Sequence, residues 1–210
     1  MDSLSRSVKI KTIILLVLYL VGLIGILSPF HGYFIVLSPI NLFLSAIIIF
    51  PMQQVKSQWF HLIAIFILGY FVELLGIRTG IPFGHYHYGS SLTPLLMEVP
   101  IIIGLNWWIL AFGSTELASR FSRNRFIQPL FASVIMTSFD LILEQVAPKL
   151  DFWHWEHEAI PIQNFIGWFL VSLIFNSLIQ KFYKPQQKNR LAERLFAIQA
   201  VFFLILMVLL

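Results

Sequence analysis

The sequence predicts an all-α fold, a polytopic membrane bundle of about seven transmembrane helices with a cytoplasmic N-terminus. Composition is the first observation behind this prediction. Hydrophobic residues make up 58% of the 210 residues and charged residues only 11%, whereas soluble domains carry about 25% charged residues. The second observation is that the apolar residues form runs close to the roughly 20 residues that a helix needs to cross a bilayer. The absence of cysteine excludes disulfides, thiolate metal sites and thiol nucleophiles.

The hydrophobic segments are separated by short polar or turn-forming stretches. The first segment follows three basic residues like a secretory leader, but no small-residue cleavage site comes after it, so we expect it to be a span. A turn at Pro29 and Gly32 leads into the second segment. No internal repeat or soluble segment is visible, and residues 1–210 are expected to form one domain. The expected spans are Ile10–Leu27, Tyr33–Phe50, Phe60–Ile77, Val99–Ala118, Ile127–Ala147, Ile162–Phe182 and Leu191–Leu210.

The orientation follows from the basic residues, since Lys and Arg favour the cytoplasmic side of a membrane. With the N-terminus inside, all of the 14 Lys and Arg residues except Arg78 and Lys149 fall on the cytoplasmic side. The net charge of +4 therefore reflects membrane topology and does not indicate a nucleic-acid partner. The chain is expected in the cell membrane. The acidic residues expected in the outer half or just beyond it are Glu73, Glu98, Asp140, Glu144, Asp151, Glu156 and Glu158.

A polar stripe runs along the fifth expected span. Ser133, Thr137, Asp140 and Glu144 follow the i, i+4, i+7, i+11 spacing that keeps side chains on one helical face. Ionisable groups inside a membrane are costly and are candidates for function. We therefore expect this stripe to line the bundle interior. In the alternative interpretation, the Ser and Thr hydroxyls bond their own backbone and the two carboxylates reach the interface.

Two further acidic residues have structural and functional interpretations. Glu73 lies about one turn inside the outer end of the third expected span, where it could pair with Arg78 or act in catalysis. Glu98 precedes Val99-Pro100 at an expected helix start, and a carboxylate there suits the helix dipole. We expect Glu98 to be a helix cap.

Aromatic and amide side chains gather near the same expected end of the bundle. The tryptophans could form an interfacial belt or an aromatic wall around a cation-like intermediate. Asn106 and Asn164 lie one to two turns inside the outer ends of their expected helices. The tryptophans concerned are Trp107, Trp108, Trp153, Trp155 and Trp168.

Four histidines suggest a metal site as an alternative. His85 and His87 precede the fourth expected span, and His154 and His157 precede the sixth. A mononuclear site is conceivable, but the spacing of these residues is not diagnostic of one. We predict no metal and no cofactor.

The outer segments resemble the CruF-type carotenoid hydratases, small polytopic membrane proteins of carotenoid biosynthesis. The resemblance runs from about Gly69 to Leu170. The matching pieces are Ile81-Pro82-Phe83-Gly84-His85-Tyr86-His87-Tyr88-Gly89, Val99-Pro100, Asn106-Trp107, Asp140-Leu141 with Glu144, the pair Trp153 and Trp155, and Pro161 with Asn164-Phe165-Ile166-Gly167-Trp168.

The resemblance implies cofactor-independent addition of water to a terminal isoprenoid double bond of a carotenoid, giving a tertiary alcohol at C-1′. Family substrates include monocyclic carotenes such as γ-carotene and, in archaea, C50 carotenoids. A carboxyl group in an apolar site has its charged form disfavoured and can serve as a general acid. We therefore expect Asp140 to protonate the alkene, with Glu73 and Glu144 as the other catalytic candidates. The candidate substrate-binding residues are Tyr86, Tyr88, Asn106, Trp107, Trp153, Trp155, Asn164 and Trp168.

A carotenoid is a rigid rod about as long as the hydrocarbon core of a bilayer is thick, roughly 30 Å. Lying across the membrane, it would place one end group at the outer interface, where water is available. We expect it to enter through a groove between the third to sixth spans that is open to lipid. The expected partners are membrane lipid, the carotenoid and other carotenoid-biosynthesis enzymes, with no nucleic acid.

Three other functions are weighed against hydration. Transporters place their sites near the midplane on repeated halves, whereas the polar groups here gather toward one face and no repeat is visible. A retinal protein would need a lysine in its last span, and residues 196–210 contain none. A non-catalytic carotenoid-binding scaffold would leave Asp140 and Glu73 without a role.

Overall fold

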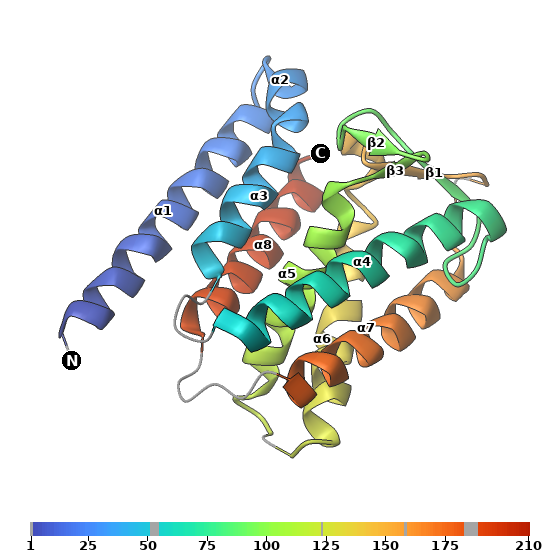
Figure 1. The fold of residues 1–210 in the computed structure, drawn as a ribbon. Coiled ribbons are helices and arrows are strands. Elements are labelled where there is room, and N and C mark those ends of the chain that lie inside the picture. The colour runs from blue at the N-terminus through green and yellow to red at the C-terminus, as the bar shows by residue number, and fades with distance from the viewer. Residues whose placement is uncertain (1, 51–54, 123, 158, 183–188) are drawn as a thin grey trace.

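The computed structural model describes residues 2–50, 55–122, 124–157, 159–182 and 189–210, and is mostly helical (Figure 1). Four residues used in the predictions, Arg123, Glu158, Lys184 and Lys188, lie outside these ranges. The described α-helices are α1 (Asp2–Ile26), α2 (His31–Val36), α3 (Ser38–Ile49), α4 (Val55–Thr79), α5 (Ile102–Ala118), α6 (Ile127–Leu143), α7 (Ile162–Phe182) and α8 (Arg190–Leu209). The described strands are β1 (Tyr86–Tyr88), β2 (Leu95–Leu96), β3 (Val99–Pro100) and β4 (Trp153–Trp155), with a 3₁₀ turn at Pro148–Leu150.

Four of the described helices are long and apolar enough to cross a membrane, which supports the predicted membrane class. They are α1, α4, α7 and α8, with apolar stretches of 20 or 21 residues. The helices α3, α5 and α6 have 12, 17 and 17 residues, at or below the short end of the range for a spanning helix. The seven-span arrangement and the cytoplasmic N-terminus stay predictions.

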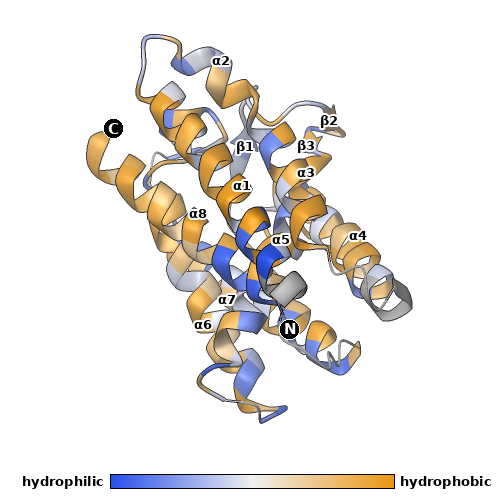
Figure 2. Cartoon of the chain, turned by 90° about the vertical axis from the view of Figure 1, so that its left-hand side faces the viewer, coloured by the Kyte–Doolittle hydropathy of each residue, from blue (hydrophilic) through white to orange (hydrophobic). Residues whose placement is uncertain are grey.

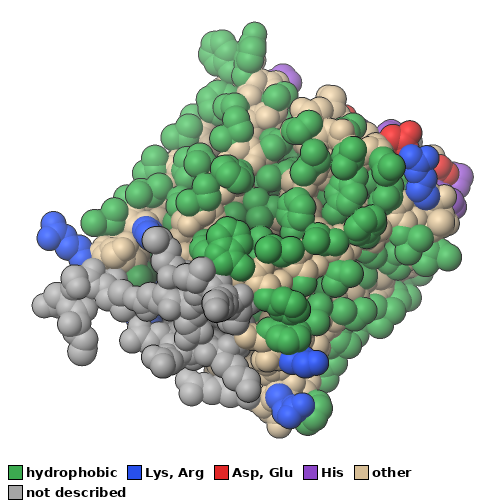
Figure 3. Space-filling model, in the orientation of Figure 1, with side chains coloured by type: hydrophobic (Ala, Val, Ile, Leu, Met, Phe, Trp, Pro, Cys, Tyr) green, Lys and Arg blue, Asp and Glu red, His purple; other side chains and the backbone are tan. Residues whose placement is uncertain are grey.

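Hydrophobic side chains cover much of the outside of the bundle. Hydrophobic residues make up most of the length of α1, α3 and α8 (Figure 2). In space-filling view, hydrophobic side chains form a broad green surface with charged side chains toward its margins (Figure 3). Lipid-facing positions such as Ile24, Phe43 and Phe71 are more than half exposed. An apolar exterior of this extent suits hydrocarbon as the solvent.

The segment expected as one helix over Tyr33–Phe50 is two helices in the structure. The break falls at Leu37, between α2 and α3. Pro39 occupies the first turn of α3, where its missing N–H is tolerated, whereas farther along a helix it would remove a backbone bond. The proline therefore begins a new helix instead of continuing the old one.

The helix α5 is the centre of the bundle. It packs against α3, α4, α6, α7 and α8, and nearly every residue from Ile103 to Ala118 is buried. Close approach to α4 depends on Gly69, since a Cβ placed there would lie 2.9 Å from Cβ of Trp107. Small residues at such contacts allow helices to approach each other in membranes.

The start of α5 differs from the expected one. Val99-Pro100 forms the strand β3, paired with β2, and the helix begins at Ile102. Glu98 lies in the turn of this hairpin with a φ of 71°, and its carboxylate lies 3.5 Å from Arg78. The predicted role of Glu98 as a helix cap is therefore wrong, because the hairpin displaces the helix start.

Candidate functional site

A short two-stranded sheet covers one end of the bundle and positions four of the eight candidate substrate-binding residues. The strand β1, from the loop after α4, pairs antiparallel with β4, from the loop after α6 (Figure 1). Successive side chains on a strand point to opposite faces. The inner face of the sheet consists of Tyr86, Tyr88, Trp153 and Trp155, all buried or half-buried.

The outer face of the same sheet holds two of the histidines considered for a metal site. His87 and His154 are opposite each other in the register, and their rings stack with centroids 5.4 Å apart. Among the described residues, no group of three or more His, Asp or Glu side chains is arranged to hold a metal ion. These histidines face away from the buried carboxyl groups, because they alternate with the aromatic residues.

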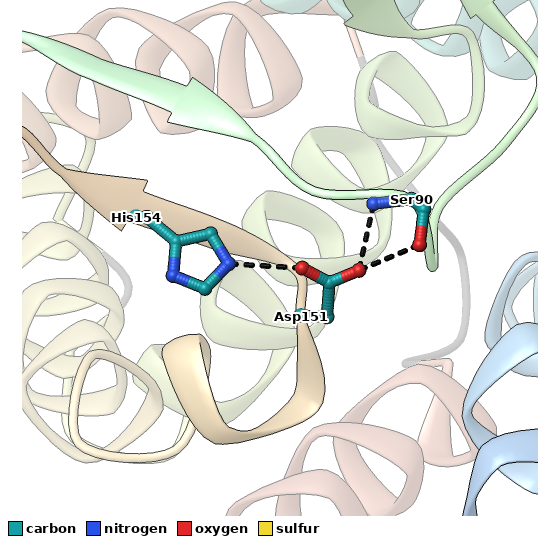
Figure 4. A network of polar contacts seen from close by, with 3 residues as sticks. All are labelled: Ser90, Asp151 and His154. Atoms are coloured by element: carbon teal, nitrogen blue, oxygen red, sulfur yellow. Dashed lines mark hydrogen bonds and ion pairs between the residues drawn. The ribbon is translucent and has the colours of Figure 1, made fainter.

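Asp151, in the loop after α6, is hydrogen-bonded to Ser90 in the loop after α4, and so links the two loops that carry β4 and β1 (Figure 4). Its Oδ2 accepts hydrogen bonds from the backbone N–H (2.8 Å) and the hydroxyl (2.6 Å) of Ser90, and Oδ1 lies 2.9 Å from Nε2 of His154. The bonds from Ser90 lower the pKa of the Asp151 carboxyl below its usual range. Only glycine fits at position 89, next to Asp151, because a Cβ there would overlap the Asp151 backbone oxygen.

Glu73, on α4, lies under this sheet and is 5% exposed. Its Oε2 accepts hydrogen bonds from the hydroxyls of Tyr86 and, at 2.8 Å, Tyr88, and its Oε1 accepts one from Nε1 of Trp107 at 2.7 Å. The suggested pairing with Arg78 is wrong. Residues five apart lie on different sides of a helix, and Arg78 contacts Glu98 instead.

Asp140, on α6, and Glu144, the residue that caps its C-terminal end, are linked by one amide from α7. Nδ2 of Asn164 donates to Oδ2 of Asp140 at 2.9 Å and to Oε1 of Glu144 at 3.0 Å. Oε2 of Glu144 accepts from Nε1 of Trp153 at 3.1 Å and of Trp155 at 2.8 Å. These carboxyl groups are 0% and 2% exposed. Within the described part of the chain, Oδ1 of Asp140 has no hydrogen-bond partner.

The polar stripe thus faces the bundle interior, as expected. Ser133, Asp140 and Glu144 are buried and Thr137 is half-buried. The alternative interpretation, in which the hydroxyls bond their own helix backbone, also holds for Ser133, because its hydroxyl donates to the Pro129 carbonyl oxygen. The two carboxyl groups are buried inside the protein instead of lying at its surface.

A small cavity of about 20 Å³ lies between the carboxyl groups and the aromatic rings. Such a volume suits one water molecule. Trp107 and Trp168 stack on one side of it with centroids 4.3 Å apart. The cavity is lined by every predicted site residue except Asp140, which lies behind Asn164 and bonds to it. The described lining residues are Glu73, Phe83, Tyr86, Tyr88, Ile103, Asn106, Trp107, Glu144, Trp153, Trp155, Asn164 and Trp168.

The five tryptophans considered for an interfacial belt are all buried, at 8% exposure or less. Four of them line the small cavity. Trp108 does not, and its Nε1 donates to Nδ1 of His61 at 3.0 Å, on the α4 side of α5. The belt interpretation therefore does not apply to these residues.

A second, larger cavity of about 220 Å³ adjoins the first and shares Ile103, Asn106 and Trp153 with it. Its walls come mainly from α1, α3, α6 and α8 and are mostly apolar. The substrate groove was expected between the third to sixth spans, which are α4 to α7 in the structure. The larger cavity lies elsewhere, so the expected position is wrong for it. The pairs α4–α5 and α6–α7 pack against each other most extensively, which leaves space on the opposite side of α5.

Two residues of the small cavity were missed in the sequence. Phe83 stacks on Trp107 at 6.0 Å, and Ile103 belongs to both cavities. Phe83 could have been found, because it lies inside the 81–89 segment that carries the resemblance. Ile103 has no signal that separates it from any other apolar helix residue.

The carotenoid biosynthesis protein family matches residues 30–210 of this chain, and the chain belongs to that family. It is 28% identical over 158 residues to the bisanhydrobacterioruberin hydratase of Haloarcula japonica. This alignment covers 71% of the chain and 54% of the relative, so the chain spans about half the length of the relative it matches. No solved structure matches it significantly. These findings confirm the resemblance to a carotenoid-biosynthesis family that includes a hydratase.

Proposed function

We propose that this membrane protein is a cofactor-independent carotenoid hydratase, which adds water to a terminal isoprenoid double bond and yields a 1′-hydroxy carotenoid. The observation that carries the proposal is the meeting of Glu73, Asp140 and Glu144 under an aromatic sheet, beside an apolar cavity. The family and the hydratase relative support the same chemistry.

The acid in this proposal is the pair Asp140 and Glu144. Two buried carboxylates without a cation are costly when both are charged, and Asn164 holds the two groups together through a single Nδ2. A proton held by the pair passes to C-2′ of the alkene. Glu144 contacts the small cavity and delivers its own proton. Asp140 lies behind Asn164, bonded to the same Nδ2, and a second carboxyl group so close disfavours ionisation of Glu144 before the alkene arrives.

Protonation at C-2′ leaves a tertiary cation at C-1′. Trp107, Trp155 and Trp168 line the small cavity, and Trp153 lines both cavities. With the end group held where the two cavities meet, these rings lie near the charge, and aromatic faces attract cations. Trp107 and Trp168 stack on each other and Trp155 packs at an angle against Tyr86, so the rings are held in place before the charge develops.

The final step is capture of the cation by water. The small cavity accepts one water molecule, and Asn106 lies between it and the larger apolar cavity. The water oxygen bonds to C-1′ and its proton passes to a carboxylate, either Glu73 or the pair that gave the first proton. One water is consumed, and the protons balance within the site.

Expression in cells that make lycopene or γ-carotene tests the proposal. We expect a pigment heavier by one water, detected by mass spectrometry of the extracted carotenoids. Glu144→Gln keeps an oxygen for the two indoles but cannot donate a proton as a carboxylic acid does, and it should lower turnover by about 10²-fold or more. Asp140→Asn should also lower it, with folding and pigment binding retained.

The controls for this experiment separate loss of chemistry from loss of protein. Each variant is quantified in the membrane fraction. Unchanged pigments with the wild-type protein present in the membrane would refute hydration and favour a non-catalytic carotenoid-binding role. Near wild-type turnover of Asp140→Asn would remove that residue from the mechanism.

A further inference from the structure

An open, apolar groove of about 310 Å³ runs along the outside of the bundle between α1 and α8. Tyr19 is its only residue with a polar side chain among those described, and the Tyr19 hydroxyl accepts a hydrogen bond from Nε2 of Gln199 at 2.9 Å. The groove thus offers a ligand hydrocarbon contacts. The wall residues at helical spacing are Leu16, Leu20 and Leu23 on α1 and Ala197, Val201 and Ile205 on α8.

Basic residues continue both walls of the groove toward the same end of the bundle. Lys9 lies seven residues before the first wall residue of α1, and Arg190 and Arg194 lie seven and three residues before the first wall residue of α8. These spacings keep side chains on one helical face. Both helices begin at the lower end of the bundle in Figure 1, and Nη1 of Arg194 donates to the Thr12 hydroxyl at 2.7 Å across them.

The general bias of basic residues toward one side of a membrane explains the end at which these residues lie, but not their shared face. The helix dipole does not explain them either, because it favours cations at the C-terminus of a helix, and Arg190 and Arg194 are in the first turns of α8. The acidic neighbour Glu193 pairs with Arg120. The groove therefore ends at a cationic surface, in which Lys9 and Arg190 are exposed and Arg194 is half-buried.

The depth of the groove matches one leaflet of a bilayer. With a rise of 1.5 Å per residue, Leu16 and Leu23 lie about 6 Å and about 17 Å from Thr12 along the axis of α1. One leaflet contributes about 15 Å of hydrocarbon, half the thickness of the core. An acyl chain along these leucines therefore has its phosphate at the level of Lys9 and Arg194.

Two other occupants are less complementary to this surface. A second copy of the chain in the same membrane has its basic end at the same depth, and like charges brought together are unfavourable. A carotene has no anionic group, so it would leave the basic end of the groove without a partner.

We propose that the groove between α1 and α8 binds an anionic phospholipid, with one acyl chain along its apolar walls and the phosphate at Lys9, Arg190 and Arg194. The site does not depend on the proposed hydration. Tyr19 and Phe202, which pack edge to face with centroids 5.4 Å apart, belong to the walls of both the groove and the larger cavity. The bound chain therefore covers the partition between surrounding lipid and that cavity.

Native mass spectrometry tests the site. The full chain in detergent micelles is mixed with equimolar phosphatidylglycerol and phosphatidylcholine that carry identical acyl chains, and the retained lipids are quantified. We expect a preference for phosphatidylglycerol of about 10-fold or more, because each basic residue near a membrane surface contributes about 5-fold to such binding. Lys9→Gln and Arg190→Gln, both at exposed positions, should each lower the preference by about 5-fold.

Lys11→Gln is the matched control, since it removes the same charge from the same helix. Lys11 lies five positions before Leu16, which places it about 140° around the helix and off the groove. This variant should keep the preference for phosphatidylglycerol. Equal losses in Lys9→Gln and Lys11→Gln would assign the effect to net charge and overturn the site.

The apolar part of the site is tested by Ala197→Phe, which fills the groove at an exposed position and leaves every basic residue in place. Retention of phosphatidylglycerol should then fall to that of phosphatidylcholine. Unchanged retention would place the acyl chain elsewhere and overturn the proposal. Displacement of the lipid by inorganic phosphate would overturn it in favour of a free-anion site, and retention of a carotenoid in preference to both phospholipids would assign the groove to pigment.

Discussion

At the scale of single residues, the site is built by donors that converge on carboxylate oxygens. Glu73 receives two phenol hydroxyls and one indole N–H, and Glu144 receives two indole N–H groups and one amide. A buried carboxyl oxygen without a donor costs free energy, so these bonds stabilise the site. Among the described residues these partners are all neutral, and a neutral donor does not repel a developing carbocation as a cation would.

One of the two indole hydrogen bonds to Glu144, that from Trp155, can be removed while an aromatic ring is kept at position 155. In Trp155→Phe, the 2.8 Å hydrogen bond to Oε2 is lost and the aromatic face is largely kept. We expect a destabilisation of about 1–3 kcal/mol, because a buried carboxyl group loses a partner, together with a clear fall in turnover. Thermal unfolding and pigment analysis measure the two effects.

Trp108→Phe is the matched control for this change. It removes a buried indole bond of 3.0 Å to His61, outside the small cavity. Its stability should fall by a comparable amount while turnover per folded molecule is unchanged. Equal turnover of Trp155→Phe and Trp108→Phe would mean that the indole bond to Glu144 has no part in catalysis.

Residue roles were predictable from the sequence to different degrees. The spacing of Asp140 and Glu144 correctly placed both on the interior face of their helix, because helical periodicity alone determines that face. The partners of Glu73 were not predictable in this way. They depend on the loop after α4 folding back as β1, and the nearest cation in sequence was the wrong choice.

At the scale of elements, close packing of α4 on α5 positions Trp107 for its bond to Glu73. Gly69→Ala would place a Cβ 2.9 Å from Cβ of Trp107. Because such a contact forces the helices apart, we expect a loss of about 1–3 kcal/mol and reduced turnover. Gly32→Ala is the control, since a Cβ there meets nothing within 4 Å, and it should leave the unfolding temperature and turnover unchanged.

The sheet of β1 and β4 is expected to respond to acid through Asp151. The pKa of this carboxyl is lowered in the folded protein by its bonds from Ser90. The stabilisation is therefore fully present above the unfolded value, which lies near 3.8, and is lost as the pH falls through the lower folded value. The protection of the Ser90 amide from hydrogen exchange should accordingly stay constant above about pH 4 and fall as the pH drops below it, toward the lower folded value.

The neighbouring amide of Gly89 provides an internal control for acid sensitivity. It donates to the backbone oxygen of Phe152 at 3.0 Å, an acceptor that does not titrate. Its protection should change less than that of Ser90 over the same range. In Asp151→Asn the difference between the two amides should no longer depend on pH, and a persisting dependence would assign the effect to another group.

At the scale of the whole molecule, the class was more predictable than the span count. Hydrophobic runs identified the helical segments, because lipid requires an apolar surface and internally satisfied backbone. Their exact lengths were not predictable. Pro39 divides the second segment, and the β2–β3 hairpin takes the residues expected at the start of α5. Pro39 is a sequence signal for a helix start that the single predicted span did not use, whereas the hairpin has only a weak signal, since short strands depend on tertiary contacts.

Orientation is a property of the whole molecule that labelling can test, and the absence of native cysteine makes the test clean. His87 and Arg125 are exposed in the loops before and after α5, so they lie at opposite ends of that helix. With the site toward the extracytoplasmic face, His87→Cys in intact cells should react with a membrane-impermeant maleimide and Arg125→Cys should not. After membrane permeabilisation both should react. Labelling of Arg125→Cys alone in intact cells would invert the orientation and place the carboxyl groups at the cytoplasmic face, without altering the chemistry proposed for them.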